Sequence, residues 1–148
     1  MKNSFTVRLK GKRYCIPYRS YQTLNHIPAM SQEKLCVYTR NHDGFIRERS
    51  LVQLLKYPEI KYTSIPYILK LAEEYVLEIT EIVLANLPRI PDTMWGEFLR
   101  ENPRWLDLME CHCISYWDCY YRHRLYSAFT NRNDYPGLQV VKFLRNIQ

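Results

Sequence analysis

Apolar and polar residues alternate with a period of two near the start of the chain, where residues 5–9 read Phe-Thr-Val-Arg-Leu. A second short apolar run, at residues 14–18, follows a turn that contains Gly11. Two such runs on either side of a glycine-containing turn predict a β-hairpin. Because Pro17 has no N–H to donate, the second strand is expected to be an edge strand or to end there. Residues 19–30 are expected to form a connecting loop.

From Ser31 onward, apolar residues recur at the three-and-four spacing of α-helices. Ser31 is a candidate N-cap for a first helix, and Gly44 is expected to end that helix in the left-handed conformation. A second helix is expected to end before Pro58. The longest periodic stretch, from Ser64 through Val83, predicts one continuous central helix. Its polar side has four glutamates: Glu73, Glu74, Glu78 and Glu81.

Prolines and capping residues predict three more helices. Asp92 is a candidate cap for a short helix that ends near Arg100, and Asn102 for a long helix that extends to about Tyr126. A final short helix is expected at residues 136–146. The fold class that follows is mainly α, a compact domain of about five to six helices with a small N-terminal β-hairpin. The expected domain organisation is a single domain over 1–148, with the basic hairpin and loop at 1–30 and the helical body at 31–148.

The composition is that of an ordinary globular protein, with 47% hydrophobic and 24% charged residues among 148. The first residues lack the apolar core of a secretory signal, and no later stretch has about 18 uninterrupted apolar residues. A cytoplasmic location without a membrane partner is therefore the expectation. The five cysteines are an odd number without the spacing of a disulfide framework, so reduced, mostly buried thiols are expected.

The formal net charge of +6 arises at one end of the chain. Residues 1–32 contain six basic side chains and no carboxylate, whereas the charges of the remaining residues cancel. Four aromatic residues interleave with these cations: Phe5, Tyr14, Tyr18 and Tyr21. The combination suits nucleic acid, because cations neutralise phosphates and rings stack on exposed bases. The alternatives are a solvated charge run, or a hairpin that docks on the acidic side of the central helix.

Residues 31–55 form one predicted helix-turn-helix unit with two interpretations. Asp43, an aliphatic-Arg pair at residues 46–47, the small Ser50 and a following leucine make its second helix resemble that of a HEAT-type helical repeat. The resemblance implies that Asp43 and Arg47 are structural and that the unit offers a protein-binding surface. The other interpretation is a DNA-binding helix-turn-helix. The second helix has suitable residue types for it in Arg47, Arg49, Gln53 and Lys56.

His112, Cys119 and His123 share one face of the predicted long helix, because they are separated by seven and four residues. This spacing suits a soft transition metal, or a thiolate set beside an imidazole. The alternative is a buried stripe whose histidines are hydrogen-bonded to neighbouring tyrosines. The sequence has no Cys-x-x-Cys pair and no phosphate-binding glycine loop, so no cofactor is expected.

Two classes of function follow. The first is a non-catalytic, protein-binding helical module that exposes an aromatic patch, drawn from Tyr57, Tyr62, Tyr67 and Trp95. The second is nucleic-acid binding, with seven candidate contacts: Arg8, Lys10, Lys12, Arg13, Arg19, Arg47 and Arg49. An enzyme or metal site on the Cys/His stripe comes third, because it requires those side chains to line an open cleft. The oligomeric state is left open.

Overall fold

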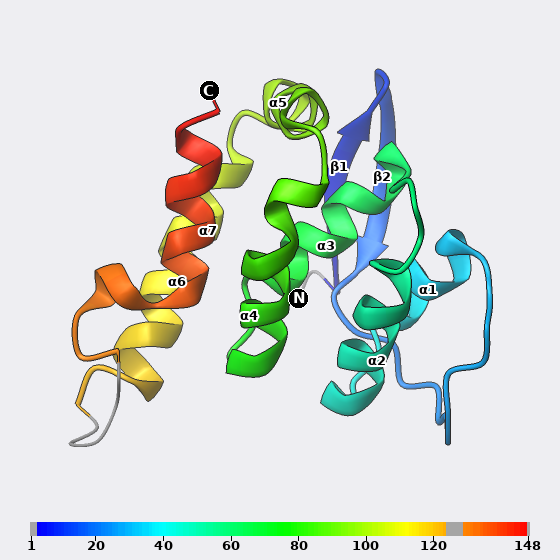
Figure 1. The fold of residues 1–148 in the computed structure, drawn as a ribbon, viewed down its shortest axis with the longest axis horizontal. Coiled ribbons are helices and arrows are strands. Elements are labelled where there is room, and N and C mark those ends of the chain that lie inside the picture. Colours follow the sequence, from blue (N-terminus) through cyan, green and yellow to red (C-terminus); the bar gives the residue numbers. More distant parts are fainter. Residues whose placement is uncertain (1–2, 124–128, 148) are drawn as a thin grey trace. The chain divides into compact units, whose positions relative to one another are not determined.

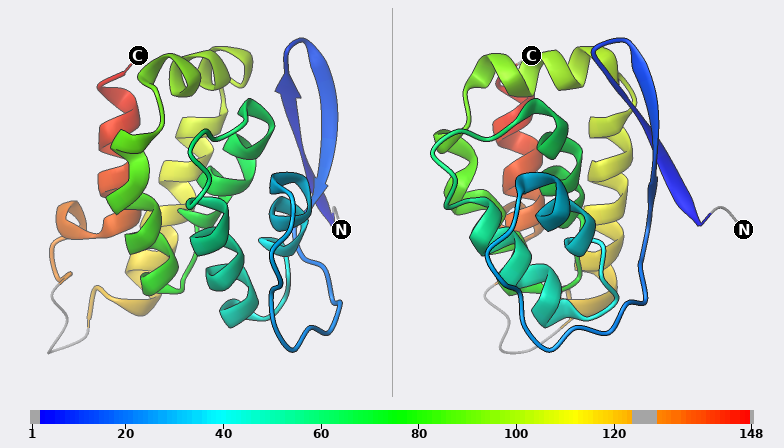
Figure 2. Two further views of the ribbon diagram at one scale, coloured as in Figure 1. Left: turned by 45° about the vertical axis from the view of Figure 1, so that its right-hand side comes forward. Right: turned by 90° about the vertical axis from the view of Figure 1, so that its right-hand side faces the viewer.

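The computed structural model describes residues 3–123 and 129–147 (Figures 1 and 2). The chain divides into two compact units, Met1–Leu69 and Lys70–Gln148. The mainly helical fold class with an N-terminal hairpin is confirmed, and the single domain expected over residues 1–148 stays a prediction. Among the described residues, no helix combines the length and the apolar character that crossing a bilayer requires.

In the first unit, β1 (Ser4–Leu9) and β2 (Lys12–Pro17) form the predicted antiparallel hairpin. Only two residues make the turn, Lys10 with φ 52° and Gly11 with φ 76°. Positive φ at both central residues is typical of the type I′ turn, whose twist matches that of the strands. One face of the hairpin is buried through Val7, Leu9 and Ile16. The opposite face, with Arg8 and Arg13, is exposed, and so are Lys12 and Tyr14 beside the buried residues.

Side-chain caps begin the two helices that follow. In α1 (Gln32–Tyr38), Ser31 is the N-cap as predicted, and its hydroxyl accepts from the N–H of Lys34 at 3.4 Å. In α2 (Gly44–Leu54), the Asp43 carboxylate accepts from the N–H of Phe45 at 2.8 Å. The prediction that Gly44 ends α1 is wrong. Because Asp43 caps the next helix, Gly44 is its first residue, and α1 ends earlier.

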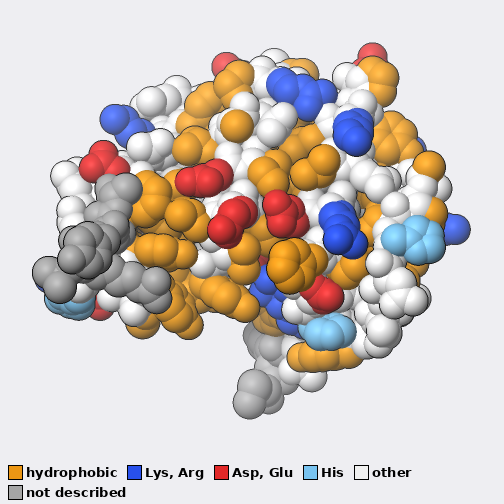
Figure 3. Space-filling view, turned by 60° about the horizontal axis from the view of Figure 1, so that its bottom comes forward, with side chains coloured by type: hydrophobic (Ala, Val, Ile, Leu, Met, Phe, Trp, Pro, Cys, Tyr) orange, Lys and Arg blue, Asp and Glu red, His pale blue; other side chains and the backbone are white. Residues whose placement is uncertain are grey.

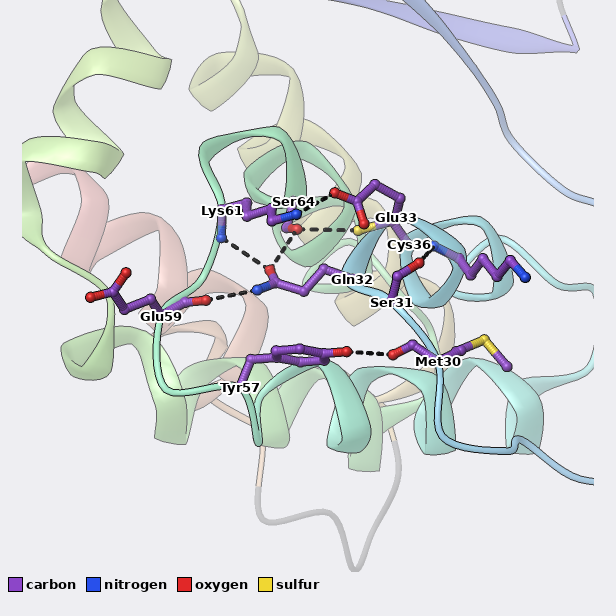
Figure 4. A network of polar contacts seen from close by, with 10 residues as sticks. Met30, Ser31, Gln32, Glu33, Cys36, Tyr57, Glu59, Lys61 and Ser64 are labelled. Carbon is purple, nitrogen blue, oxygen red and sulfur yellow. Dashed lines mark hydrogen bonds and ion pairs between the residues drawn. The ribbon is translucent and has the colours of Figure 1, made fainter.

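The buried amide of Gln32 joins α1 to the chain that follows α2 (Figure 4). Its Nε2 donates to the carbonyl of Glu59 at 2.7 Å, and its Oε1 accepts from the N–H of Lys61 at 3.0 Å and from the Ser64 hydroxyl at 3.2 Å. Gln32 is only 5% exposed. Leaving a buried amide or its partners unsatisfied costs about 1–3 kcal/mol. This network therefore fixes residues 58–64 against α1.

The continuous central helix predicted from Ser64 is wrong. The chain forms η1 (Tyr62–Ser64) and α3 (Ile65–Leu71), leaves the helical conformation at residues 72–76, and resumes as α4 (Leu77–Asn86). The interruption raises the number of α-helices among the described residues to seven, against the five or six expected.

Hydrogen bonds from distant side chains explain this break. Three side chains donate to backbone carbonyls of residues 72–75. The Cys113 thiol donates to Ala72 at 3.6 Å and the Tyr135 hydroxyl to Glu74 at 3.3 Å. The Tyr121 hydroxyl donates to Tyr75 at 2.9 Å. They replace the bonds that an uninterrupted helix would supply to its own backbone. Because the donors lie about forty or more residues away along the chain, helical periodicity gives no sign of them.

The break also buries a carboxylate. Glu73 Oε2 lies 2.7 Å from Lys70 Nζ and 2.7 Å from His112 Nδ1, and the Glu73 side chain is 5% exposed. Glu74 is likewise buried, at 3%. Two of the four glutamates expected on a solvated helix side are therefore inside, because the chain turns there instead of continuing as a helix.

The rest of the second unit comprises η2 (Leu87–Arg89), α5 (Asp92–Glu101), α6 (Trp105–Tyr120), η3 (Arg132–Asp134) and α7 (Pro136–Arg145). α7 packs against both α4 and α6 (Figure 1). Asp92 is the first residue of α5 rather than its cap, which is Pro91. The helix expected to reach Tyr126 ends at Tyr120, and Tyr126 lies outside the described residues. The final helix is confirmed.

Close packing at Gly137 leads to a stability prediction. A Cβ there would lie 2.9 Å from Cys113 Sγ, 3.1 Å from the Ala72 carbonyl oxygen and 3.2 Å from a ring carbon of Tyr135. Gly137→Ala is therefore expected to lower the free energy of unfolding by roughly 1–3 kcal/mol, as overpacking does. Urea denaturation followed by circular dichroism measures the change.

Gly96→Ala is the matched control, within α5 of the same unit. The closest atom to its Cβ would be the flexible Arg100 guanidinium at 3.2 Å. Alanine is better than glycine inside a helix by up to about 1 kcal/mol, so this variant is expected to match or exceed the wild type. Equal stability of the two variants would contradict the packing argument.

Candidate nucleic-acid interface

The solvent face of the hairpin gathers positive charge. In the strand register Arg8 lies directly opposite Arg13, and both are exposed. Like charges at directly opposite positions repel each other, so an anion placed over the pair lowers the electrostatic energy. Lys12, also exposed, pairs with the buried Leu9 next to the turn, so its side chain lies on the other face from Arg8 and Arg13. These three cations gather at the turn end of the hairpin, and we call them the anion-binding strip.

Lys10 extends the strip to the turn. Its ammonium lies 4.6 Å from the centroid of the Tyr62 ring, within range of a cation–π contact. Lys10 is nevertheless exposed, so Tyr62 positions the charge without hiding it. Arg19, beyond the other end of β2, is partly buried and donates to the Tyr18 carbonyl at 3.0 Å.

Arg47 does not belong to this surface. It is 1% exposed, and its Nη1 donates to the carbonyls of Asn41 at 3.0 Å and His42 at 2.9 Å. Arg47 therefore holds the chain between α1 and α2, while Arg49 on the same helix is exposed. The HEAT-type resemblance of residues 31–55 stays a prediction.

Gln53, like Arg47, is bound within the protein and does not support the interpretation of α2 as a DNA-reading helix. Gln53 Nε2 donates to the carbonyl of Ile27 at 2.8 Å, so this amide is bound to the preceding loop. Of the four side chains expected to face DNA, only Arg49 and Lys56 are exposed. Lys56 lies beyond the end of α2, so only Arg49 remains as an exposed cation of this set on the helix. One cation is a small basis for major-groove recognition, and the hairpin is the stronger cationic surface.

Positive charge is unequally divided between the units. Met1–Leu69 contains 12 basic and 4 acidic residues, a net charge of +8, whereas Lys70–Gln148 contains 9 basic and 11 acidic residues, a net charge of −2. The two values combine to the +6 of the whole chain. An electrostatic attraction to polyanions therefore originates in the first unit.

An exposed aromatic platform lies in the same unit. Tyr21 is 77% exposed, and its ring stacks on His42 with 5.4 Å between centroids and 23° between planes. The sequence pattern indicates Tyr21 as an aromatic neighbour of the cations but gives no sign of His42. No local pattern links the two, since the contact depends on how residues 19–30 return to the end of α1.

The aromatic patch predicted for protein binding is not found where it was expected. Trp95 is fully buried, with its indole N–H donating to the Leu87 carbonyl at 3.3 Å. The Tyr57 hydroxyl is bound to the Met30 carbonyl (Figure 4). Burial raises the pKa of the half-buried Tyr67. The expectation of an exposed patch at these positions is therefore wrong for Trp95.

Tyrosines of the second unit make a different aromatic surface. The Tyr75 ring lies 6.4 Å from that of Tyr116 and 5.9 Å from that of Tyr120, and Tyr116 stacks on Tyr120 at 6.3 Å. Tyr75 is 49% exposed and Tyr120 44%. We call these three residues the tyrosine patch.

Hydrophobic side chains also reach the surface beside charged ones in other places, as Figure 3 shows for one face.

The Cys/His stripe is not the buried face of α6. That face consists of Leu106, Met109, Cys113 and Trp117. His112, Cys119 and His123 are all exposed, and His112 Nδ1 is bound to Glu73. Within residues 3–123 and 129–147, no three histidine, cysteine or acidic side chains are grouped as metal ligands. The structure therefore does not bring the three predicted ligands together.

Two surface grooves of the second unit bear on the enzyme hypothesis. The first, about 510 Å³, lies between α6 and α7 and has Ile114, Arg132 and Lys142 among its lining. The second also contains Ile114 and Arg132. Neither is lined by His112, Cys119 or His123. The catalytic hypothesis therefore gains no support from these grooves.

Comparison of the chain with protein-family models, with curated proteins and with solved structures found no match.

The reactivity of the five cysteines can test which of their thiols are buried. All five are free thiols, but only Cys36 and Cys113 are buried, so the expectation of mostly buried thiols is wrong. Burial raises the pKa of the Cys36 thiol to about 11 and that of Cys113 to about 12, and the nearby Glu73 carboxylate adds to the second shift. At pH 8 roughly one in a thousand of these thiols, or fewer, is ionised.

Brief iodoacetamide treatment of the native protein at pH 8 is expected to modify three cysteines rapidly: Cys15, Cys111 and Cys119. The other two are expected to react only after unfolding. Peptide mass spectrometry with and without urea distinguishes the sites. Rapid native modification of Cys36 or Cys113 would contradict their burial.

Proposed function

We propose that the first unit binds nucleic acid through the cations at the turn end of its hairpin. The observation that supports this most directly is the cross-strand pair Arg8 and Arg13, both exposed, next to the exposed Lys12. Several exposed cations close together at one end of a strand pair attract the phosphates of a nucleic-acid backbone. The net charge of +8 on this unit adds long-range attraction.

The proposed mechanism is neutralisation of phosphates with release of counterions. Contacts of this kind position a nucleic acid without reading its sequence, so binding is expected with little base preference from the hairpin alone. For single strands, the logarithm of the binding constant falls against the logarithm of salt concentration with a slope of roughly −0.7 per contacted phosphate. Three or four contacts therefore give a slope of roughly −2 to −3.

The test removes two cations from the strip. Lys12→Ala/Arg13→Ala is expected to weaken binding of a fluorescent 12-nucleotide RNA or DNA and to make the salt slope shallower by roughly 1.4, because two phosphate contacts are lost. Fluorescence anisotropy at a series of salt concentrations measures both quantities. Circular dichroism checks that the variant is folded.

The matched control removes the same charge elsewhere in the unit. Lys34 and Lys56 are both exposed and lie outside the hairpin. Lys34→Ala/Lys56→Ala is expected to leave the salt slope close to that of the wild type. Equal effects of the two double variants would mean that net charge and not the strip causes binding. Absence of binding at low salt would overturn the proposal.

A protein partner is the second candidate, supported by the tyrosine patch. Exposed aromatic side chains are enriched where proteins contact each other. Two rings of the patch, Tyr75 and Tyr120, are each close to half exposed although they pack against Tyr116. This candidate uses the second unit, so it is independent of the hairpin.

A photo-crosslinking amino acid placed at position 120 tests this second candidate in living cells. It is expected to form adducts with a defined set of proteins, whereas the same amino acid at the exposed Arg104 position of the same unit is not. Adduct patterns are compared on denaturing gels and by mass spectrometry. Identical patterns at the two positions would mean that the tyrosine patch is not a binding surface.

A further inference from the structure

Tyr21 is anchored through its neighbours although it is largely exposed. It is 77% exposed, the highest value among the large hydrophobic residues described as exposed. One of its faces lies against the His42 imidazole, with 5.4 Å between the centroids. The arrangement leaves the other face of the Tyr21 ring open to solvent.

The backbone on both sides of Tyr21 is fixed by hydrogen bonds. Ser20 donates its N–H to the Arg40 carbonyl at 2.7 Å and accepts from the N–H of His42 at 2.8 Å. These bonds form a parallel bridge between Ser20 and Asn41. On the other side, Asn41 Nδ2 donates to the Gln22 carbonyl at 2.7 Å. Tyr21 therefore projects from an anchored segment, although it lies in a loop.

His42 is also anchored. Its Nδ1 lies 3.3 Å from the Ser20 carbonyl oxygen, and its backbone carbonyl accepts from the buried Arg47. The two stacked rings thus share one framework, which orders them before any ligand arrives. An aromatic ring that is ordered in advance loses little entropy when a second flat group stacks on it.

We propose that the open face of Tyr21 stacks on an unpaired base of a single-stranded nucleic acid. This inference rests on the proposed function of the hairpin and specifies its ligand. A strand of six residues covers roughly 20 Å, so β2 leads away from the cations near the turn to Pro17, and Tyr21 follows four residues later. A single strand can place its phosphates on this strip and turn a base onto the ring.

Strand preference follows from this geometry. Bases of a duplex are already stacked on their neighbours, and a side chain gains access to them only if they are unstacked. Phosphate contacts are available in both forms of nucleic acid. The cations therefore bind either form, and the contact at Tyr21 favours the single strand.

The test compares single-stranded and duplex 12-nucleotide DNA of the same sequence. Tyr21→Ala is expected to weaken binding of the single strand roughly tenfold, within the range for loss of one stacked base, and to leave duplex binding unchanged. Tyr21→Phe, which keeps the ring, is expected to retain single-strand affinity. In Tyr21→Trp, addition of the single strand is expected to quench the indole fluorescence.

Phe45→Ala is the control, because Phe45 is a similarly exposed ring of the same unit, at 72%. It is expected to bind both forms as the wild type does. Salt-sensitive binding that depends on Lys12 and Arg13 but is unaffected by Tyr21→Ala would overturn the stacking proposal and leave the hairpin proposal standing. Loss of duplex binding equal to that of the single strand would also overturn it. No binding of either form by the wild type would overturn both.

Discussion

The second unit depends on the interrupted chain between α3 and α4. Backbone carbonyls at residues 72–75 lose helical partners there, and a buried carbonyl without a donor is costly. Side chains of Cys113, Tyr121 and Tyr135 supply those donors. The same turn places the Glu73 carboxylate between an ammonium and an imidazole. Because four of these five contacts connect the break to a distant part of the chain, the break is tied to the packing of α6 and α7. The same packing leaves no space for a side chain at Gly137.

Local signals identified most elements of the fold, and nonlocal contacts account for the errors. The hairpin, the Ser31 cap and the final helix follow from residues within a few positions of one another. The break after α3 does not, since its hydrogen-bond donors lie in the last third of the chain. Periodicity also cannot distinguish a solvated glutamate from one that is buried beside a lysine, as at Glu73.

For the candidate interface too, local signals in the sequence were informative and nonlocal contacts were not. Charge counting identified the hairpin cations, because an excess of lysine and arginine is visible in any sequence. It could not separate Arg47, which holds two backbone carbonyls, from the exposed Arg49 two residues later. The stack of Tyr21 on His42 likewise requires knowledge of the bridge between Ser20 and Asn41. The cationic strip and the Tyr21 platform both belong to the first unit.

The two-stranded sheet has a further consequence for solubility. Among the described residues β1 and β2 pair only with each other, so each strand has an edge with no strand beside it. Open edges invite pairing with other chains, and charged residues and proline on them discourage it. Arg8, Arg13 and Pro17 therefore act as gatekeepers against aggregation. If a polyanion binds the strip as proposed, neutralising the arginines would remove part of that protection and would couple binding to self-association of the hairpin.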